Sequence, residues 1–439
     1  MSSSPDINPA VAVPEDMTGR PRRVVSGKIS LRHTFSALRH RNFRLFFTGQ
    51  LVSLTGTWLT TTAQGWLVYQ LTGSKALLGI VAAAASAPML FFSTWGGWAA
   101  DRYPKRSVLV ATQAASMILS LIMAALVWSG HIKPWQIIVV AIFGGITMAF
   151  DMPARQSFVI EMTSREDLMN AISLNSSAFN SARIIGPSLA GVLMAQVGIA
   201  MCFFLDGISF IAVIAGLLMM RLPKNSRLKT SSGALTQSLE AFRYVRNHPR
   251  VLTILALFAV VGIFGWSYSV LMPAFAHDVL HLGEQGYGML LAGSGVGALV
   301  AALTVATVGH LFPTRTVALS GVWIFAVSLA LFAFNRNFYI AILLLALSGF
   351  GIVLYFSTSN TVLQTIVADE MRGRVMGIWT LIFGGMIPLG SLQAGLMADF
   401  VGTPGTIAFG ALICALAALV TLQVARRREA LQARAAQEP

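Results

Sequence analysis

The sequence predicts an all-α, polytopic membrane protein whose twelve transmembrane helices form two pseudo-symmetric six-helix bundles. Three observations predict this fold class: the composition, the succession of long apolar runs, and the uneven distribution of Lys and Arg. Hydrophobic residues make up 55% of the 439 residues and charged residues only 11%, whereas a soluble domain carries about 25% charged residues. A chain of this length has room for about a dozen spans of ~20 residues joined by short connections.

The apolar runs divide the chain into twelve predicted spans. Helices are expected because lipid offers no partners to open backbone groups, and the alternation typical of barrel strands is absent. The predicted spans are 45–70, 76–100, 107–129, 134–152, 170–196, 199–220, 251–274, 285–308, 316–334, 338–361, 375–399 and 404–424. They delimit an N-terminal tail (1–42), a first bundle (43–220), a central loop (221–250), a second bundle (251–425) and a C-terminal tail (426–439).

The distribution of Lys and Arg predicts the orientation in the membrane. Of the 31 basic residues, 27 fall in the tails and in the loops on one side, and only Lys75, Lys133 and Arg336 fall on the other. Arg183 remains inside a span. Basic loops stay in the cytoplasm. Both termini and the central loop are therefore predicted to be cytoplasmic, in a multi-pass protein of the plasma membrane, namely a bacterial inner membrane.

Several classes of protein are disfavoured by the composition and motifs. The net charge of +14 would fit a nucleic-acid partner, but the basic residues lie in loops and tails rather than in a folded basic domain. Cys202 and Cys414 both fall in apolar runs, which favours packing over a disulfide or metal pair. No phosphate-binding loop and no nucleophile motif occurs, so we expect neither an enzyme nor a cofactor.

Two histidines four residues apart, His277 and His281, stand near Asp278 and Glu284 after the seventh span. Such spacing can place two metal ligands on one helix face. Because no further ligand is evident, we interpret the segment as a solvated loop and predict no metal site.

The two halves of the chain resemble each other. Residues 184–198 align without a gap with residues 388–402, sharing three glycines, an alanine and a valine. The loop 101–108 likewise matches 310–317 at nearly the same offset. Duplicated halves are typical of secondary transporters, which hold the substrate between the repeats.

Residues 97–106, GWAADRYPKR, are similar to the loop signature of the major facilitator superfamily. Gly97, Asp101, Arg102, Lys105 and Arg106 match that signature, while a proline at 104 replaces its glycine. Gly97 also lies one turn before Asp101, where a small residue lets a neighbouring helix approach closely.

The resemblance implies that Asp101 acts as a conformational gate. In that superfamily the loop Asp caps a helix of the other half in the outward-facing state, and the eleventh span, beginning near Arg374, would receive it through the helix dipole. Asp151, at the predicted end of the fourth span, is a candidate partner for Arg102 or Arg106.

The segment 182–191, ARIIGPSLAG, is similar to the antiporter signature of the same superfamily. Gly186, Pro187 and Gly191 match and would form a hinge in the fifth span; ordinary small-residue packing around a proline is the alternative. Segments 153–162, 170–187, 271–280 and 369–377 resemble the enterobactin-exporter-like branch, which contains siderophore and drug exporters.

Arg183 is the most informative candidate for a substrate or coupling site. It lies ~20 Å from the cytoplasmic end of its helix, too deep to reach water easily. Ser176, Asn180 and Arg183 share a helix face, and we expect that face to line an aqueous cavity. The alternative is an Arg that ties helices together through carbonyl groups or a carboxylate.

Further candidates are polar or aromatic residues inside spans. Asp206 is the one acid well inside a predicted span and could carry a proton or serve as a neutral structural residue. Aromatic and amide side chains could contact a substrate or, near span ends, anchor the interface: Gln64, Trp58, Trp266, Tyr268, Tyr355 and Asn360.

Together these features predict a secondary active transporter that works by alternating access. We expect a proton-coupled exporter of a small amphipathic or anionic organic compound, siderophore- or drug-like, acting as a monomer in the lipid bilayer without a nucleic-acid partner. A facilitator or lysophospholipid-type flippase is the alternative within the class. A non-transporting receptor or enzyme on the same fold is the alternative of another class.

Overall fold

The computed structural model describes residues 36–164, 166–221 and 234–435. Within these residues the chain is helical and forms no strand. Most of the predicted N-terminal tail, residues 222–233 of the predicted central loop and residues 436–439 of the predicted C-terminal tail therefore lie outside the described residues.

The first half of the described chain holds one short 3-10 helix and six long helices. They are η1 (Ser36–Arg39), α2 (Arg41–Thr72), α3 (Lys75–Arg102), α4 (Lys105–Trp128), α5 (Pro134–Met162), α6 (Leu168–Val197) and α7 (Ile199–Met219).

The second half begins with a series of short helices and continues with long ones. The short helices include two of π type, η2 and η4. In chain order, the helices of the second half are α8 (Ala234–Asn247), α9 (Pro249–Val260), η2 (Val261–Gly265), η3 (Trp266–Ser269), α10 (Met272–Ala274), η4 (Phe275–Val279), α11 (Glu284–Val308), η5 (Gly309–Leu311), α12 (Thr314–Phe334), α13 (Phe338–Ile366) and α14 (Asp369–Ala435).

Every predicted span coincides with a helix or, for the seventh, with the series from α9 to α10. Eight of the described helices are long and apolar enough to cross a membrane. The count is nine if Glu240–Asn247 and Pro249–Gly265, which meet at a bend of 103°, are taken as one span. The long α14 contains two predicted spans, because its backbone leaves the helical conformation at Gly402, where φ is 76°. The more polar α2 and α6 fall outside this count.

The ends of several helices differ from the ends of the apolar runs. The fourth span was predicted to end at 152, but α5 continues to Met162, so Asp151 lies inside the helix rather than at its end. Likewise α14 begins at Asp369 rather than near Arg374. The apolar run ends where lipid ends, whereas the helix continues because its hydrogen bonds lie within its own backbone.

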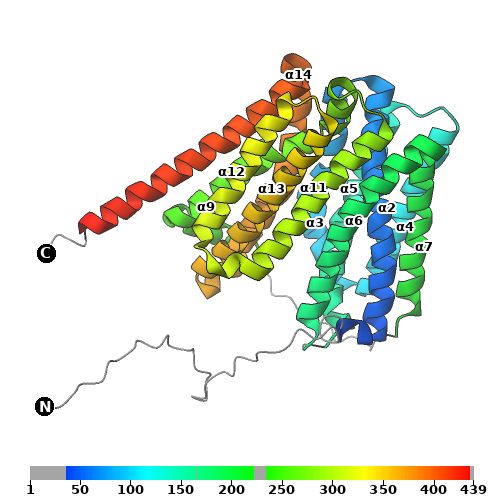
Figure 1. Cartoon of the computed structure of the whole chain (residues 1–439). Coiled ribbons are helices and arrows are strands. Elements are labelled where there is room, and N and C mark those ends of the chain that lie inside the picture. Colours follow the sequence, from blue (N-terminus) through cyan, green and yellow to red (C-terminus); the bar gives the residue numbers. More distant parts are fainter. Residues whose placement is uncertain (1–35, 165, 222–233, 436–439) are drawn as a thin grey trace, which may run out of the picture.

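The helices form two groups that match the two halves of the sequence (Figure 1). In the first group α2 packs on α6 and α7, while α3 packs on α5; in the second, α13 packs on both α11 and α12. Small residues allow these approaches: a Cβ at Gly96 would lie 2.1 Å from the Ala149 carbonyl oxygen, inside van der Waals contact.

Two helix pairs join the halves, α3 with α14 and α6 with α11. Glycines meet at both crossings. A Cβ at Gly79 would lie 2.4 Å from the carbonyl oxygen of Ser391 and 2.9 Å from Cα of Gly395. A Cβ at Gly288 would lie 2.9 Å from Cα of Gly191.

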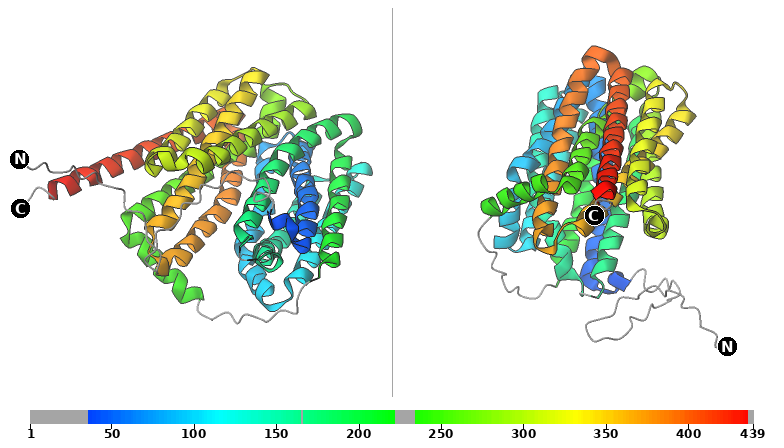
Figure 2. Two further views of the ribbon diagram at one scale, coloured as in Figure 1. Left: turned by 60° about the horizontal axis from the view of Figure 1, so that its bottom comes forward. Right: turned by 90° about the vertical axis from the view of Figure 1, so that its left-hand side faces the viewer.

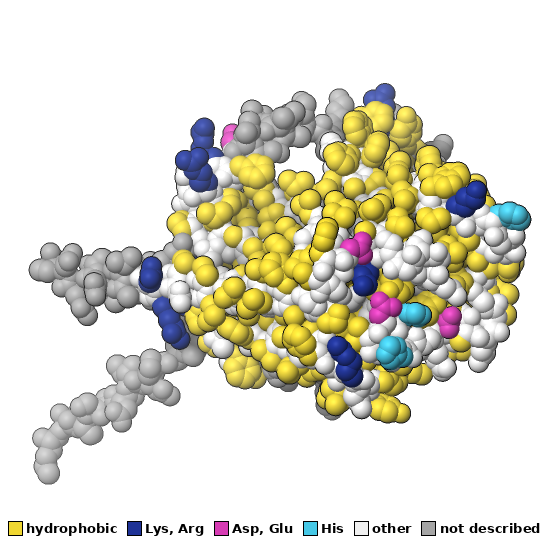
Figure 3. All heavy atoms as spheres, turned by 90° about the horizontal axis from the view of Figure 1, so that it is seen from above, with side chains coloured by type: hydrophobic (Ala, Val, Ile, Leu, Met, Phe, Trp, Pro, Cys, Tyr) yellow, Lys and Arg dark blue, Asp and Glu magenta, His cyan; other side chains and the backbone are white. Residues whose placement is uncertain are grey.

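These crossings lie at one end of the molecule. We call the end that holds residues 41–44, 102–106, 219–221 and 369–374 the basic end, and the end that holds residues 72–75, 277–284 and 402 the opposite end. The halves meet toward the opposite end and diverge toward the basic end (Figures 1 and 2). The opposite end carries a small group of acidic, His and basic side chains near the middle of a largely uncharged face (Figure 3).

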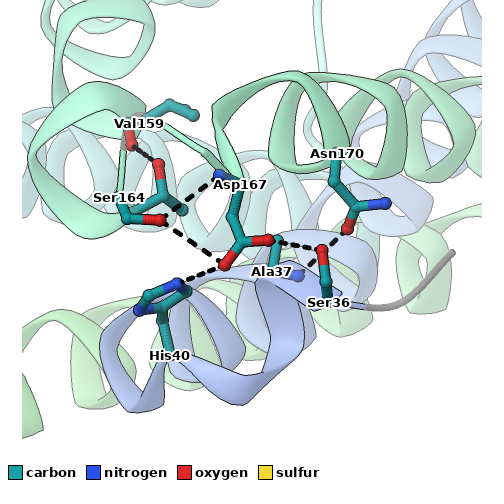
Figure 4. A network of polar contacts seen from close by, with 8 residues as sticks. Ser36, Ala37, His40, Val159, Ser164, Asp167 and Asn170 are labelled. Carbon is teal, nitrogen blue, oxygen red and sulfur yellow. Dashed lines mark hydrogen bonds and ion pairs between the residues drawn. The ribbon is translucent and has the colours of Figure 1, made fainter. Parts of the chain in front are cut away.

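A polar cluster at the basic end fastens η1 to the start of α6 (Figure 4). Ser36 Oγ donates to Asp167 Oδ1 at 2.5 Å, and His40 Nε2 lies 2.8 Å from Asp167 Oδ2. The backbone N–H of Ala37 donates to the Asn170 side chain at 3.0 Å. The hydrogen bond from Ser36, followed by that with His40, holds the pKa of Asp167 below its usual value.

Candidate functional site

Arg183 lies between two tryptophans that belong to different halves. Its guanidinium carbon is 5.9 Å from the ring centroid of Trp58 on α2 and 5.5 Å from that of Trp266 on η3. Both distances fall in the range of cation–π contacts. Among the described residues Arg183 forms no ion pair and no side-chain hydrogen bond, so its five N–H donors have no protein acceptor there. The alternative, in which Arg183 ties helices together through a carbonyl group or a carboxylate, is not seen among the described residues.

The predicted polar face of α6 continues from Arg183 toward the basic end. Asn180 is half-buried and donates to the Ser176 carbonyl at 2.9 Å, while Ser176 is exposed. From Arg183 toward the opposite end, α6 packs on α11. This contact begins at Arg183 itself, whose carbonyl oxygen would lie 3.2 Å from a Cβ at Gly295. Arg183 therefore lies at the level where the halves separate.

An aromatic cavity adjoins this position in the second half. Its volume is about 340 Å³, and it is lined by aromatic and small polar side chains: Phe258, Phe356, Ser357, Asn360, Thr361, Trp379 and Phe383. The Trp266 ring that contacts Arg183 stacks on Phe356, with centroids 6.3 Å apart. Phe258 and Trp379 stack at 3.6 Å. A planar apolar group fits such walls, and the Asn360 amide supplies a polar contact.

A cross-half cluster closes the opposite end. Asp278 of η4 accepts a hydrogen bond from the Tyr69 hydroxyl of α2 at 2.5 Å and lies 4.0 Å from Nζ of Lys75 on α3. Trp66 Nε1 donates to Glu284 Oε1 at 3.2 Å.

His277 extends the cross-half cluster, with Nδ1 3.0 Å from Asp278 Oδ1. Desolvation raises the pKa of Asp278, but hydrogen bonds from Tyr69 and His277 outweigh it and hold that pKa below its usual value. The segment predicted as a solvated loop is thus partly engaged with the other half.

The other predicted aromatic and amide candidates do not all reach the Arg183 site. Tyr268 is buried and pairs with Ser294, with 3.1 Å between the hydroxyl oxygens. Tyr355 is buried on a different face of α13 from Asn360 and lines a separate cavity. Gln64 is half-buried on α2, between Trp58 and Trp66 in sequence.

Asp206 lies inside the first half, where α7 meets α4 and α2. Its Oδ2 accepts from Ser120 at 2.6 Å, whereas Oδ1 is buried without a hydrogen-bond partner of ordinary geometry. A Cβ at Gly56 would lie 2.6 Å from Oδ1. Among the described residues no basic side chain pairs with Asp206, so the structure does not bring it together with Arg183.

The loop predicted to act as a gate lies at the basic end, with Asp101 and Arg102 exposed. Its basic residues contact their own half: Arg106 donates to the Leu218 carbonyl at 2.7 Å, and Lys105 pairs with Glu161. No atom lies within 4 Å of a Cβ built at Gly97. The close helix contact expected at Gly97 is made by Gly96 instead, because that face of α3 is the one turned to α5.

Asp151 is buried in the first half and has three partners there. It accepts from Thr112 Oγ1 and Gln113 Nε2, both at 2.8 Å, and from Arg155 Nε at 2.7 Å. Arg102 instead lies over Trp98, 5.5 Å from the ring centroid. The predicted contact of Asp151 with Arg102 or Arg106 is not made in this conformation and stays a prediction for the closed basic end.

The glycines around Pro187 pack α6 closely on both of its neighbours. A Cβ at Gly186 would lie 2.5 Å from Trp58 Cβ, and one at Gly191 would lie 2.9 Å from the Glu284 carbonyl oxygen. The helix runs from Leu168 to Val197 with Pro187 inside it. These contacts are those expected of small-residue packing; the hinge role stays a prediction.

Several site residues escaped the sequence reasoning. Phe356 and the pair Trp379 and Phe383 build the aromatic cavity, and Tyr69 belongs to the cross-half cluster. The spacing of four between Trp379 and Phe383 places them on one helix face. No comparable signal marks Tyr69, because its partner is 209 residues away.

A model of the family described as transmembrane secretion effector, within the major facilitator superfamily, matches residues 32–438. The chain is 28% identical to the multidrug efflux pump Tap of Mycobacterium tuberculosis, covering 88% of this chain and 94% of Tap. It is 26% identical to the staphyloferrin A transporter of Staphylococcus aureus, covering 82% of this chain and 90% of that transporter. It is also 26% identical to the enterobactin exporter EntS of Citrobacter koseri, over 88% and 93%.

Solved structures share the fold at low sequence identity. The nucleoside transporter NupG superposes with a TM-score of 0.69 at 15% identity, covering 88% of this chain and 98% of NupG. A bacterial homologue of the lysosomal transporter Spinster, solved inward-facing and unoccupied, gives 0.68 at 15% identity, over 90% and 98%.

Proposed function

Because the chain belongs to the transmembrane secretion effector family of the major facilitator superfamily, we propose that it exports a small amphipathic or anionic organic compound by alternating access. Siderophore and multidrug transporters are among its relatives, so a siderophore- or drug-like compound is the proposed substrate class. The family is one of transporters, which argues against the receptor and enzyme alternatives.

The proposed orientation places the basic end in the cytoplasm of a bacterial inner membrane, as the excess of basic residues there favours. The conformation is then inward-open, with the cross-half cluster as the external gate. Asp101 and the basic residues around it would form the cytoplasmic gate when that end shuts, with Asp101 near the start of α14.

Arg183 is the single observation that carries the proposal. An Arg deep in a membrane protein, flanked by two tryptophans and without a described acceptor, is suited to an anionic group of a substrate. The guanidinium can hold a carboxylate or catecholate-type oxygen pair through two parallel hydrogen bonds. The adjoining aromatic cavity would hold the apolar part of the same molecule.

Transport into inside-out proteoliposomes, with a fluorescent anionic aromatic compound, tests this role. Arg183→Ala should abolish substrate-dependent transport, and Arg183→Lys should restore only part of it because the planar fork is lost. Thermal unfolding in detergent is measured in parallel. Arg183→Ala protein that unfolds at the wild-type temperature and still transports would contradict the proposal, as would a variant that melts much lower, since Arg183 would then hold helices together.

Proton exchange is the proposed driving force, and Asp206 is the proposed proton carrier. It is a buried acid, and one of its carboxylate oxygens completes no hydrogen bond of ordinary geometry. Asp206→Asn keeps the size of the side chain and a polar contact with Ser120 but cannot release a proton. It should abolish uphill transport driven by a pH gradient while leaving downhill exchange.

The control for Asp206 is Ser120→Ala, which removes the hydrogen bond but keeps the acid. A pH-sensitive dye reports proton movement in the same vesicles. If Asp206→Asn still moves protons with substrate, another group carries them. If the wild type transports with no proton movement at all, the protein is a facilitator or flippase.

A further inference from the structure

A second cavity lies inside the second half of the molecule, near the basic end. Its volume is about 400 Å³, and α9, α12, α13 and α14 each contribute to its wall. Most of that wall is apolar, from Ile254, Leu257, Leu319, Val362 and Ile366. The cavity is therefore suited to a hydrocarbon chain.

Helix α13 separates this cavity from the aromatic one. Tyr355, Ser359, Val362 and Ile366 line the second cavity, at spacings of four, three and four that define one helix face. The aromatic cavity takes its α13 residues from 356, 357, 360 and 361, on the neighbouring face. An occupant of the second cavity would thus press on the back of the substrate-site wall without entering the substrate site.

Positive groups gather at one part of the cavity wall. Arg250 and Arg315 both line it, and each is the second residue of its helix, α9 or α12. The N-terminal ends of the two helices, of 12 and 21 residues, add the partial positive charge and free N–H groups that favour an anion.

A buried polar group marks the inner part of the wall. The Tyr355 hydroxyl is buried and lies near Ser359, yet it completes no hydrogen bond of ordinary geometry. A buried hydroxyl whose hydrogen bond is incomplete destabilises the protein. An ester oxygen of a bound molecule would accept a hydrogen bond from the Tyr355 hydroxyl, whereas a plain hydrocarbon has no acceptor.

We propose that this cavity binds one anionic phospholipid of the surrounding membrane. Its phosphate lies at Arg250 and Arg315, an ester oxygen accepts a hydrogen bond from the Tyr355 hydroxyl, and an acyl chain lies along Leu257 and Leu319. A lipid is favoured over a transported solute because α13 separates the cavity from Arg183 and because basic pockets between helices at the cytoplasmic side suit anionic head groups. The bound lipid supports α13 and so favours the geometry of the aromatic cavity.

The test measures lipid retained by the full-length protein. Protein in dodecylmaltoside is mixed with dioleoylphosphatidylglycerol or dioleoylphosphatidylcholine, and native mass spectrometry counts the bound lipids while thermal unfolding is followed. Wild type should retain one phosphatidylglycerol that phosphatidylcholine does not replace. Arg250→Gln combined with Arg315→Gln should bind it roughly thirtyfold more weakly, since two basic groups near an anionic lipid are lost.

The matched control is Arg243→Gln combined with Arg246→Gln on α8. Both residues are exposed near the same end but do not line the cavity. Two variants that fill the cavity from different helices, Leu319→Phe and Val362→Phe, should also lose the lipid while keeping both arginines. The proposal would be overturned if the control pair lost phosphatidylglycerol as strongly as the Arg250 and Arg315 pair does. It would also be overturned if the wild type retained phosphatidylcholine as well as phosphatidylglycerol, or if both filled variants still retained phosphatidylglycerol.

A transport measurement separates this site from the substrate site. Phosphatidylglycerol should change the transport rate of the wild type without competing with the substrate, and Arg183→Ala should still retain it. Competition between lipid and substrate, or loss of the lipid in Arg183→Ala protein, would place the lipid in the substrate site. Either result would overturn the proposal of a separate lipid site.

Discussion

The two ends of the molecule use their polar residues differently. At the opposite end, Tyr69, Trp66 and Lys75 of the first half reach Asp278 and Glu284 of the second. At the basic end, Lys105 pairs with Glu161 within the first half, and Arg374 pairs with Glu240 within the second.

The difference shows which kinds of contact accompany the meeting of the two halves. Cross-half hydrogen bonds at the opposite end accompany backbone approach at Gly79 and Gly191. At the basic end Gly97 has open space around it, and Arg106 donates to a carbonyl of its own half. The opposite end thus combines glycine contacts with polar ones, and ion pairs at a surface contribute little individually.

The largest expected effect comes from overfilling the glycine contact at the opposite end. Gly79→Val should prevent that end from closing, since even a Cβ there would lie 2.4 Å from the Ser391 carbonyl oxygen; overpacking of this kind costs roughly 1–3 kcal/mol or more. Cysteine accessibility at the opposite end should rise. Gly97→Val is the matched control and should leave that accessibility unchanged or lower it. If both variants behave alike, the two ends are not distinguished by these glycines.

A smaller shift is expected from the cross-half cluster. Asp278→Asn should weaken the bond from Tyr69 and favour opening by roughly 1–2 kcal/mol, because this pair is partly exposed. The pKa of Asp278 is lowered in the closed state, so its contribution is present above the ordinary Asp pKa and is lost as pH falls through the lowered value. Accessibility labelling as a function of pH measures both effects, and Lys133→Gln at the same end is the control. If the accessibility of the wild-type protein does not change with pH, Asp278 does not contribute to the gate.

The smallest effect is expected at the basic end, in the cluster that fastens η1. The pKa of Asp167 is lowered by Ser36 and His40. Its stabilisation is therefore present above the ordinary Asp pKa and lost as pH falls through the lowered one. Asp167→Asn should lower the unfolding temperature slightly at neutral pH and flatten its fall in acid, without changing accessibility at the opposite end. A large change in transport would show that this cluster belongs to a gate instead.

The sequence by itself determined the helical membrane fold, because spanning lipid requires long apolar runs with internally satisfied backbones. It also placed Arg183 on one helix face with Asn180 and Ser176, since a shared face follows from spacing alone; their role in a substrate site stays a proposal. The family resemblance seen in residues 97–106 was confirmed by a family match over residues 32–438. Local pattern thus sufficed wherever the physical cause lies within one helix.

Only the tertiary structure decided which of these residues lie close to one another. Trp58 and Trp266 meet at Arg183, whereas Tyr355 turns to a separate cavity and Asp206 lies within the first half. Asp278 finds Tyr69 across 209 residues of sequence. Such contacts depend on how two duplicated bundles lean against each other, and that angle is set by many small packing energies spread along the whole interface.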